Sequence, residues 1–324
     1  MSLGLVLEAV LPVYVMAAAG MALRWRKVLT AEMEKGVLQM VIHLLYPCLI
    51  LDKVLGNPLA RSGATVGWGV GLGFGFIILG MVVSFGYAKA VGMARGGGLR
   101  TFTLAGGVQN FGYTAIPILA SLFVLPGGDD SVLGLLFIHS LGVELAIWIV
   151  GLMVLTGSWR QNPRLFLNGP IVAVVLGLAL SWTGGWQLLT AEGGGVAGAV
   201  VRQSMHWLGN CAFPIGLILI GATMFGLVGE EKPDWKIALG AVLVRLAVMP
   251  AVILGGAWLL PITTELKQVL VVQAAMPAAV TPIIVARHYG GNPGVAVQTV
   301  VVTSVLALVT IPLWLAVGVR VVFP

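Results

Sequence analysis

Apolar residues fill ten long stretches of the chain, and short polar or glycine-rich segments separate them. The stretches cover approximately residues 3–23, 36–55, 64–87, 101–123, 131–155, 165–182, 196–227, 237–260, 265–286 and 295–319. Each is close to the ~20 residues that a helix needs to cross about 30 Å of hydrocarbon. The pattern therefore predicts an all-α integral membrane protein with ten transmembrane helices.

Two of these stretches contain residues that interrupt a helix near its middle. The interrupting residues and the amides beside them are Gln109, Asn110, Gly112 and Pro117 in QNFGYTAIP, and Pro277 and Pro282 in QAAMPAAVTPIIVARHY. Proline lacks an N–H group and clashes with the preceding turn, so it frees backbone carbonyl groups. At membrane depth, such backbone persists only where protein buries it or where it lines a polar cavity. We therefore expect two discontinuous helices of the kind that form transporter sites.

Landmark prolines recur at a spacing close to half of the 324 residues. Pro47 pairs in this way with Pro214, and Pro117 pairs with Pro282. Because five spans per half is an odd number, the second half must enter the membrane from the opposite side. The sequence thus predicts a 5+5 inverted repeat, in which the interrupted fourth and ninth helices are equivalent and cross near the membrane midplane.

Composition and charge agree with a membrane protein. Hydrophobic residues make up 59% of the chain and charged residues 9%, whereas a soluble domain has roughly 25% charged residues. The net charge of +6 resides in short loops, with most basic residues in odd-numbered loops. The positive-inside rule places these loops in the cytoplasm and both termini outside the cell (inner) membrane. The charge therefore indicates orientation, and no nucleic-acid partner is expected.

The crossing of the two interrupted helices is the candidate substrate site. Half-helix N-termini carry free N–H groups and positive dipole ends, which favour an anion. Asn110 can add amide hydrogen bonds to a carboxylate. Its alternative role is to satisfy backbone groups that the interruption frees. The neighbouring glycine and prolines shape the site.

Three ionisable residues, His139, Glu144 and Arg245, fall within predicted spans. An unpaired charge in hydrocarbon costs at least ~2.5–3.5 kcal/mol, so Glu144 and Arg245 should face protein or water. Three alternatives follow: a structural Glu144–Arg245 ion pair, proton or sodium coupling by Glu144, and substrate contact by Arg245. His139 is either a hydrogen-bonded packing residue or shares a proton with Glu144.

Several enzymatic and ATP-driven functions lack their motifs. The chain contains neither the Walker pattern GxxxxGK[ST] nor HExxH, and it has no aspartate cluster for magnesium. Cys48 and Cys211 lie in separate spans and in no metal-binding pattern. We therefore expect a protein that is not an enzyme, without a cofactor or a bound metal, whose energy comes from ion or substrate gradients.

Three segments resemble the auxin efflux carrier family, which includes plant PIN proteins and bacterial carriers of small carboxylates. They are LPVYVMAAAGMALRWRKVLT, QNFGYTAIP and AAMPAAVTPIIVARHY. In that family an asparagine in the fourth-helix break helps to bind the substrate carboxylate, and Asn110 holds that place. A proline of the ninth-helix break matches Pro277. Plant members have proline where this chain has Gln109, and the loop at 157–164 is minimal, so the bacterial branch is the closer likeness.

The resemblance implies a fold related to sodium/bile-acid symporters and sodium/proton antiporters. Its repeats would be residues 1–160 and 161–324. Helices 1, 2, 6 and 7 would form a scaffold and a homodimer interface, and helices 3, 4, 5, 8, 9 and 10 a mobile crossover domain. The implied function is secondary transport or facilitation of small organic anions, such as malonate, malate or indole acids, by alternating access in the lipid bilayer.

The alternative is a sodium/proton antiporter or a bile-acid-type sodium symporter. Those proteins carry carboxylates at the crossing, and this sequence offers none there, which makes ion exchange the weaker idea. An intramembrane enzyme or a receptor is the remaining class.

Overall fold

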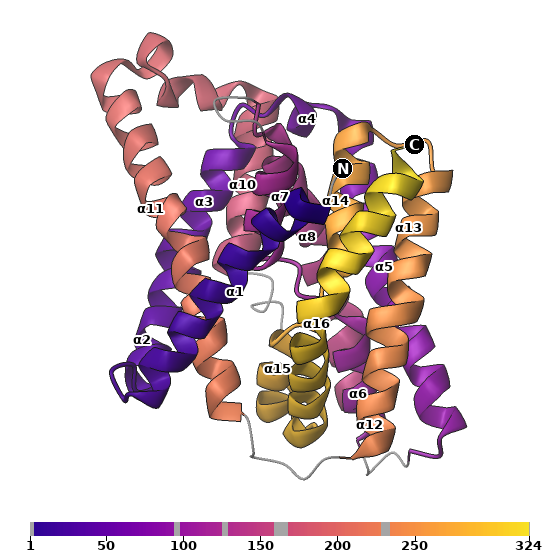
Figure 1. Ribbon diagram of the computed structural model, residues 1–324. Coiled ribbons are helices and arrows are strands. Elements are labelled where there is room, and N and C mark those ends of the chain that lie inside the picture. Colours follow the sequence, from indigo (N-terminus) through magenta and orange to yellow (C-terminus); the bar gives the residue numbers. More distant parts are fainter. Residues whose placement is uncertain (1–2, 94–97, 125–128, 159–167, 228–233, 324) are drawn as a thin grey trace.

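The computed structural model describes residues 3–93, 98–124, 129–158, 168–227 and 234–323. Within these ranges the chain is helical, with connecting turns and one isolated β-bridge, and it contains no strand. The helices lie side by side as a bundle, and the first and last described residues lie at the same end of it (Figure 1).

Seven helical runs in the described ranges are long and apolar enough to cross a membrane. They are formed by α1 (Leu3–Trp25); α2 (Ala31–Met40), η1 (Val41–Leu45) and α3 (Tyr46–Val54); α5 (Gly63–Ala90); α8 (Ser131–Ala146), η3 (Ile147–Gly151) and α9 (Leu152–Thr156); α11 (Ala191–Leu227); α12 (Trp235–Ala241), η6 (Val242–Val248) and α13 (Met249–Leu259); and α16 (Pro293–Val322). Each coincides with a predicted apolar stretch. The prediction of a multi-pass, all-helical membrane protein is therefore confirmed.

The other three predicted stretches hold shorter or interrupted helices. The short apolar helix α10 (Gly169–Thr183) covers the sixth stretch. The fourth stretch divides into α6 (Leu99–Gly107) and α7 (Ala115–Phe123), and the ninth into α14 (Thr264–Ala275) and α15 (Thr281–Tyr289). Two small elements, α4 (Pro58–Arg61) and the 3-10 helix η5 (Gly185–Leu189), lie in connections. The interruptions thus occur where the sequence predicts them.

Side-chain caps explain why some helices begin where they do. The Asn168 side chain accepts a hydrogen bond from the Ile171 N–H at 2.9 Å and caps α10. Thr263 caps α14 in the same way by accepting from the Leu266 N–H at 3.3 Å. The first N–H groups of a helix have no partner within the helix, so such caps supply the missing acceptors.

Glycines allow the helices of two pairs to pack with their backbones in direct contact. In the α5–α8 pair, a Cβ added at Gly73 would overlap the carbonyl oxygen of His139, and one added at Gly142 would overlap that of Val70. Gly221 of α11 meets the backbone of α1 in the same way. Small residues at helix interfaces permit such close packing in membrane proteins. These contacts set the position of α8, which carries Glu144.

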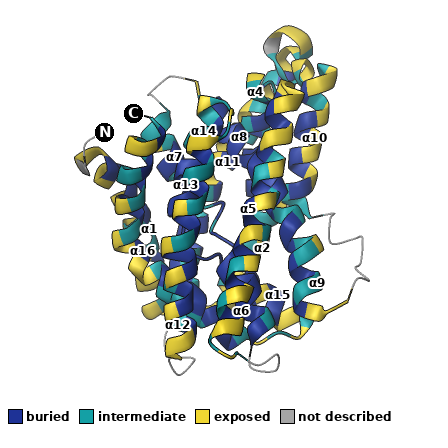
Figure 2. Cartoon of the chain, turned by 90° about the vertical axis from the view of Figure 1, so that its right-hand side faces the viewer, coloured by how far each residue is buried: buried dark blue, intermediate teal, exposed yellow. Residues whose placement is uncertain are grey.

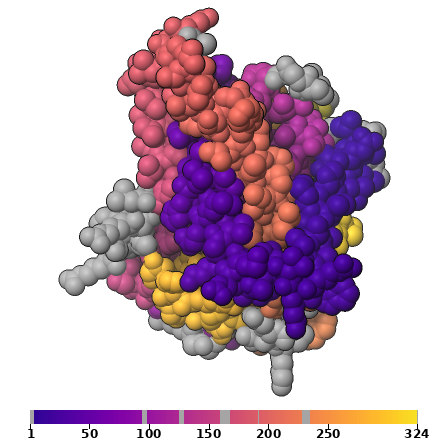
Figure 3. Space-filling view, turned by 90° about the vertical axis from the view of Figure 1, so that its left-hand side faces the viewer, coloured from indigo at the N-terminus to yellow at the C-terminus, as the bar shows by residue number. Residues whose placement is uncertain are grey.

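Burial follows the expectation for a protein surrounded by lipid. Side chains such as Ile50, Leu136 and Leu270 belong to the main buried apolar cluster. Large apolar residues such as Val15 and Val309 are exposed on outer helix faces, as the exposed regions of Figure 2 illustrate. On the face shown in Figure 3, the early helices lie beside α11. An apolar outer surface suits hydrocarbon surroundings.

Candidate functional site

The two helix interruptions lie against each other. We call residues 108–114 the first break and residues 276–280 the second break. The Asn110 N–H donates to the Pro277 carbonyl at 2.7 Å, and the Ala279 N–H donates to the Val108 carbonyl at 2.9 Å. These bonds form an antiparallel bridge between Gln109 and Ala278. The backbone groups that each interruption frees are thus partly satisfied by the other, as burial away from water requires.

The prolines of the two breaks occupy different positions. Pro277 lies within the second break, whereas Pro282 is the second residue of α15 and Pro117 the third residue of α7. A missing N–H is harmless in a first turn, because the N–H groups there have no acceptor within the helix. Pro117 and Pro282 therefore begin the second half-helices, and each break precedes its proline. Both half-helices start at the junction.

Gly112 and Asn110 shape the first break. A Cβ at Gly112 would lie 2.9 Å from the Tyr46 hydroxyl oxygen, so a larger residue there would require the Tyr46 side chain of α3 to shift. The half-buried Asn110 side chain donates from Nδ2 to the Thr114 hydroxyl at 3.0 Å. Its amide is therefore bonded to a side chain, and no backbone group of the break depends on it.

Gln109 belongs to a buried polar chain with residues of other helices. Its Oε1 accepts from Arg245 Nη1 at 3.4 Å, and its Nε2 donates to Gln273 Oε1 at 3.3 Å. Gln273 in turn donates from Nε2 to the Phe111 carbonyl at 3.1 Å. Gln273 was not among the predicted site residues. The sequence feature that could have identified it is an uncharged amide within an apolar span, four residues before Pro277.

Arg245 and Glu144 do not pair with each other. Arg245 donates from Nε to the Met276 carbonyl at 3.1 Å, while Glu144 Oε2 accepts from Trp148 Nε1 at 2.7 Å. No ion pair between the two is present among the described residues. The expected structural pair is thus not formed, because each side chain reaches a different neighbour. Both ring nitrogens of the buried His139 lack a hydrogen-bond partner within the described ranges, so its packing is apolar.

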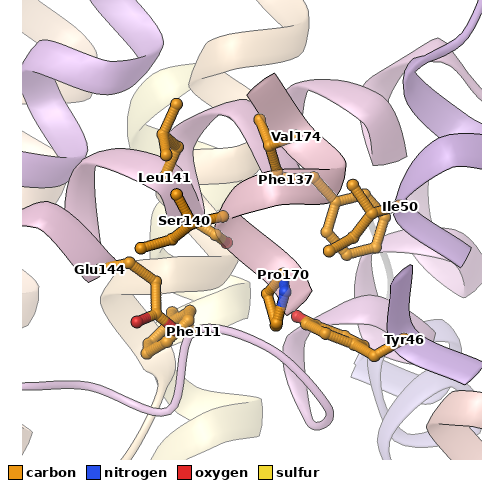
Figure 4. A pocket seen from close by; sticks show the side chains of 10 residues that line it. Tyr46, Ile50, Phe111, Phe137, Ser140, Leu141, Glu144, Pro170 and Val174 are labelled. Atoms are coloured by element: carbon orange, nitrogen blue, oxygen red, sulfur yellow. The ribbon is translucent and has the colours of Figure 1, made fainter. Parts of the chain in front are cut away.

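A small pocket adjoins the first break and reaches Glu144. It is lined by Tyr46, Ile50, Phe111, Phe137, Ser140, Leu141, Glu144, Pro170, Ile171 and Val174, from α3, α8, α10 and the first break (Figure 4). The Tyr46 ring packs on Tyr113 with centroids 5.1 Å apart. The pocket volume is about 10 Å³, room for roughly one water molecule. In this conformation the pocket is therefore closed to a carboxylic acid.

A group of charged residues ties α3 to α11 and to the start of α8. Asp52 is buried, and its carboxylate lies 3.0 Å from Lys53 Nζ, 3.3 Å from Arg202 Nε and 3.0 Å from His206 Nδ1. Lys53 also binds Asp130 at 2.7 Å. Neither Asp52 nor its three cationic partners were among the predicted site residues. The missed signal was an acidic residue at the end of an apolar span.

Comparison with known proteins identifies the relatives of this chain. A family model described as "Membrane transport protein" matches residues 5–163 and 160–315. An "Uncharacterized transporter" of Methanothermobacter thermautotrophicus is 24% identical over 314 residues, covering 95% of this chain and 96% of that protein. "Auxin efflux carrier component 8" of Arabidopsis thaliana is 24% identical over 162 residues, 50% of this chain and 42% of that protein.

Proposed function

Because the chain belongs to the auxin efflux carrier family of membrane transport proteins, we propose that it is a secondary carrier of small organic anions that binds them at the two breaks. The substrate class would be carboxylates such as malonate, malate or indole acids. The substrate would contact Asn110 and the N-terminal turns of the half-helices α7 and α15. Gln109, Gly112 and the three prolines would hold the breaks in shape.

The junction of the two breaks carries this proposal. Helices α7 and α15 each begin directly after a break, so the positive end of each helix dipole adjoins the junction of the breaks. A positive dipole end favours a negative charge. The Asn110 backbone N–H is already bonded to Pro277, and among the described residues its side chain bonds only to the Thr114 hydroxyl. Because the Asn110 amide satisfies no backbone group of the break, we favour a role in substrate contact over a role in satisfying the backbone.

Transport by alternating access would require two units that move relative to each other. We propose that α1, α2–α3, α10 and α11 form the scaffold, and that the remaining spans form the mobile unit of a 5+5 inverted repeat whose broken helices cross. Extensive packing of α1 and α3 on α11 supports this division. The pocket between α3, α10 and α8 would then open as the units separate, and the Lys53–Asp130 bond would break. Homodimerisation through the scaffold remains part of the proposal.

A sodium- or proton-coupled carrier is the second candidate, and one observation favours it. Glu144 lines the pocket and has an indole as its hydrogen-bond partner instead of a cation. Ionisable residues within a membrane often lie on ion pathways. Uptake of the same acids with and without a sodium or proton gradient would separate a coupled carrier from a facilitator.

The test uses purified protein in liposomes with radiolabelled malonate, malate and indole-3-acetate. Asn110→Ala should weaken binding about ten- to a hundredfold, since a hydrogen bond to a charged group contributes roughly 1.5–3 kcal/mol. Asn110→Asp should impair transport at least as severely, because it places a negative charge where the anion binds. Gln39→Glu, at an exposed position, adds the same charge as a control. Normal transport by folded Asn110→Asp protein at neutral pH would show that the site assignment is wrong.

A further inference from the structure

Arg245 is a fully buried cation beside the two breaks. Its side chain is 0% exposed and is among the largest fully buried side chains of the described residues. Nε contacts the second break through the Met276 carbonyl, and Nη1 contacts the first break through Gln109. Nη2 has no hydrogen-bond partner among the described residues. One guanidinium thus touches both breaks and keeps an unused donor there.

The local fold holds Arg245 at this place. It lies in the π-helical segment η6, directly before α13. Pro250, the second residue of α13, cannot donate to the Leu246 carbonyl. Trp314 Nε1 of α16 satisfies that carbonyl at 2.7 Å. A side chain of another helix therefore stabilises the widened turn of η6. Such π-helical segments are frequent at functional sites.

The charge of Arg245 is not neutralised within the described part of the protein. No carboxylate there lies within ion-pair distance of its guanidinium. Its recorded partners are a carbonyl and an amide oxygen, which are neutral dipoles. A buried charge without a counter-charge is strongly unfavourable. An arriving anion would remove this penalty.

Arg245 also sets the orientation of two amides. A guanidinium only donates, so Gln109 must turn its oxygen toward Arg245 and its NH2 group toward Gln273. Gln273 then presents its oxygen to Gln109 and its NH2 group to the Phe111 carbonyl. This series of hydrogen bonds ends at the Phe111 carbonyl, and Phe111 lines the pocket. The charge of Arg245 is thus coupled to the site through a fixed set of dipoles.

We propose that Arg245 supplies the permanent positive charge that balances the substrate anion at the two breaks. This inference rests on the proposed function and adds a source of charge selectivity to it. Asn110 and the half-helix N-termini recognise a carboxylate by hydrogen bonds, which a neutral amide could partly imitate. Arg245 makes the site prefer the acid to its uncharged amide.

The test compares binding of each acid with binding of its amide. The probes are malonate and malonamide, malate and malamide, and indole-3-acetate and indole-3-acetamide, titrated calorimetrically into purified protein. For the acid that binds the wild type, Arg245→Gln should raise Kd about ten- to a hundredfold, with little change for the amide. Arg245→Lys should keep the preference. Arg61→Gln, which removes an arginine stacked on Trp186 outside the breaks, should leave it unchanged.

A second variant covers the case in which Arg245→Gln does not fold. Gln109→Glu keeps the arginine and is nearly isosteric, but it places a carboxylate at the atom that already accepts from Nη1. This internal counter-charge should abolish the preference for the acid. If folded Gln109→Glu and Arg245→Gln proteins both retain the wild-type preference, the inference is wrong while the carrier proposal stands. If the wild type binds none of the three acids, the proposed function itself fails, and this inference with it.

Discussion

Substituting alanine for single glycines of α5 tests how this helix packs on α8. A Cβ at Gly73 would overlap the carbonyl oxygen of His139 and would lie 3.1 Å from its carbonyl carbon. Both atoms belong to the backbone of α8, which cannot move aside as a side chain could. By contrast, a Cβ at Gly71 or at Gly75 would meet nothing within 4 Å. Three glycines at alternate positions thus differ only in the side of the helix that they occupy.

The expected changes in the free energy of unfolding differ between Gly73→Ala and the other two variants. Forcing an extra methyl group into a packed interface costs typically 1–3 kcal/mol, so Gly73→Ala should destabilise the protein by about that amount. Gly71→Ala and Gly75→Ala should be neutral or should stabilise it by up to about 1 kcal/mol, because alanine favours a helix over glycine. Moving α8 outward should also displace Glu144 and the pocket, so Gly73→Ala should reduce uptake as well.

The measurement is unfolding of purified protein in mixed micelles with increasing SDS, followed by far-UV circular dichroism. Each variant is compared with the wild type, and uptake is measured on the same preparations in liposomes. Equal stability of the three alanine variants would refute the reasoning, since it would mean that Gly73 does not lie against the α8 backbone. A loss of stability confined to Gly71→Ala or Gly75→Ala would contradict the position of α8 itself.

Two further predictions concern the second break and the orientation of the chain. Thr303→Val removes the hydroxyl oxygen that accepts from the Ala278 N–H at 3.1 Å, which should cost roughly 1–3 kcal/mol in SDS unfolding by leaving a buried donor unpaired. Thr299→Val removes a hydroxyl that donates to the Val295 carbonyl of its own helix, so it should cost less, and equal losses would contradict the role of Thr303. In a background without Cys48 and Cys211, Lys27→Cys should react with impermeant reagents only from the cytoplasm and Arg61→Cys only from outside. Labelling of both from one side in intact cells would overturn the orientation.

The apolar stretches and the interruptions could be predicted from the sequence because their causes are local. A run of apolar residues forms a span wherever it lies in the fold, and a proline disrupts the turn before it in any surroundings. The assignment of the candidate site stays a prediction, which the sequence suggests because Asn110 lies next to such an interruption. The residues Gln109, Pro277 and Asn110 are accordingly in contact through the backbone bridge.

The partners of the buried polar residues depended on tertiary structure. Arg245 bonds to Gln109, 136 positions away, and to Met276, 31 positions away, instead of to Glu144. Likewise, a Cβ at Gly73 would overlap the α8 backbone, whereas one at Gly71 or Gly75 would meet nothing within 4 Å. Both outcomes depend on how each helix is rotated about its axis and which backbone it approaches. In helices that are apolar on every side, hydrophobic periodicity does not encode that rotation, so packing against the other helices decides it.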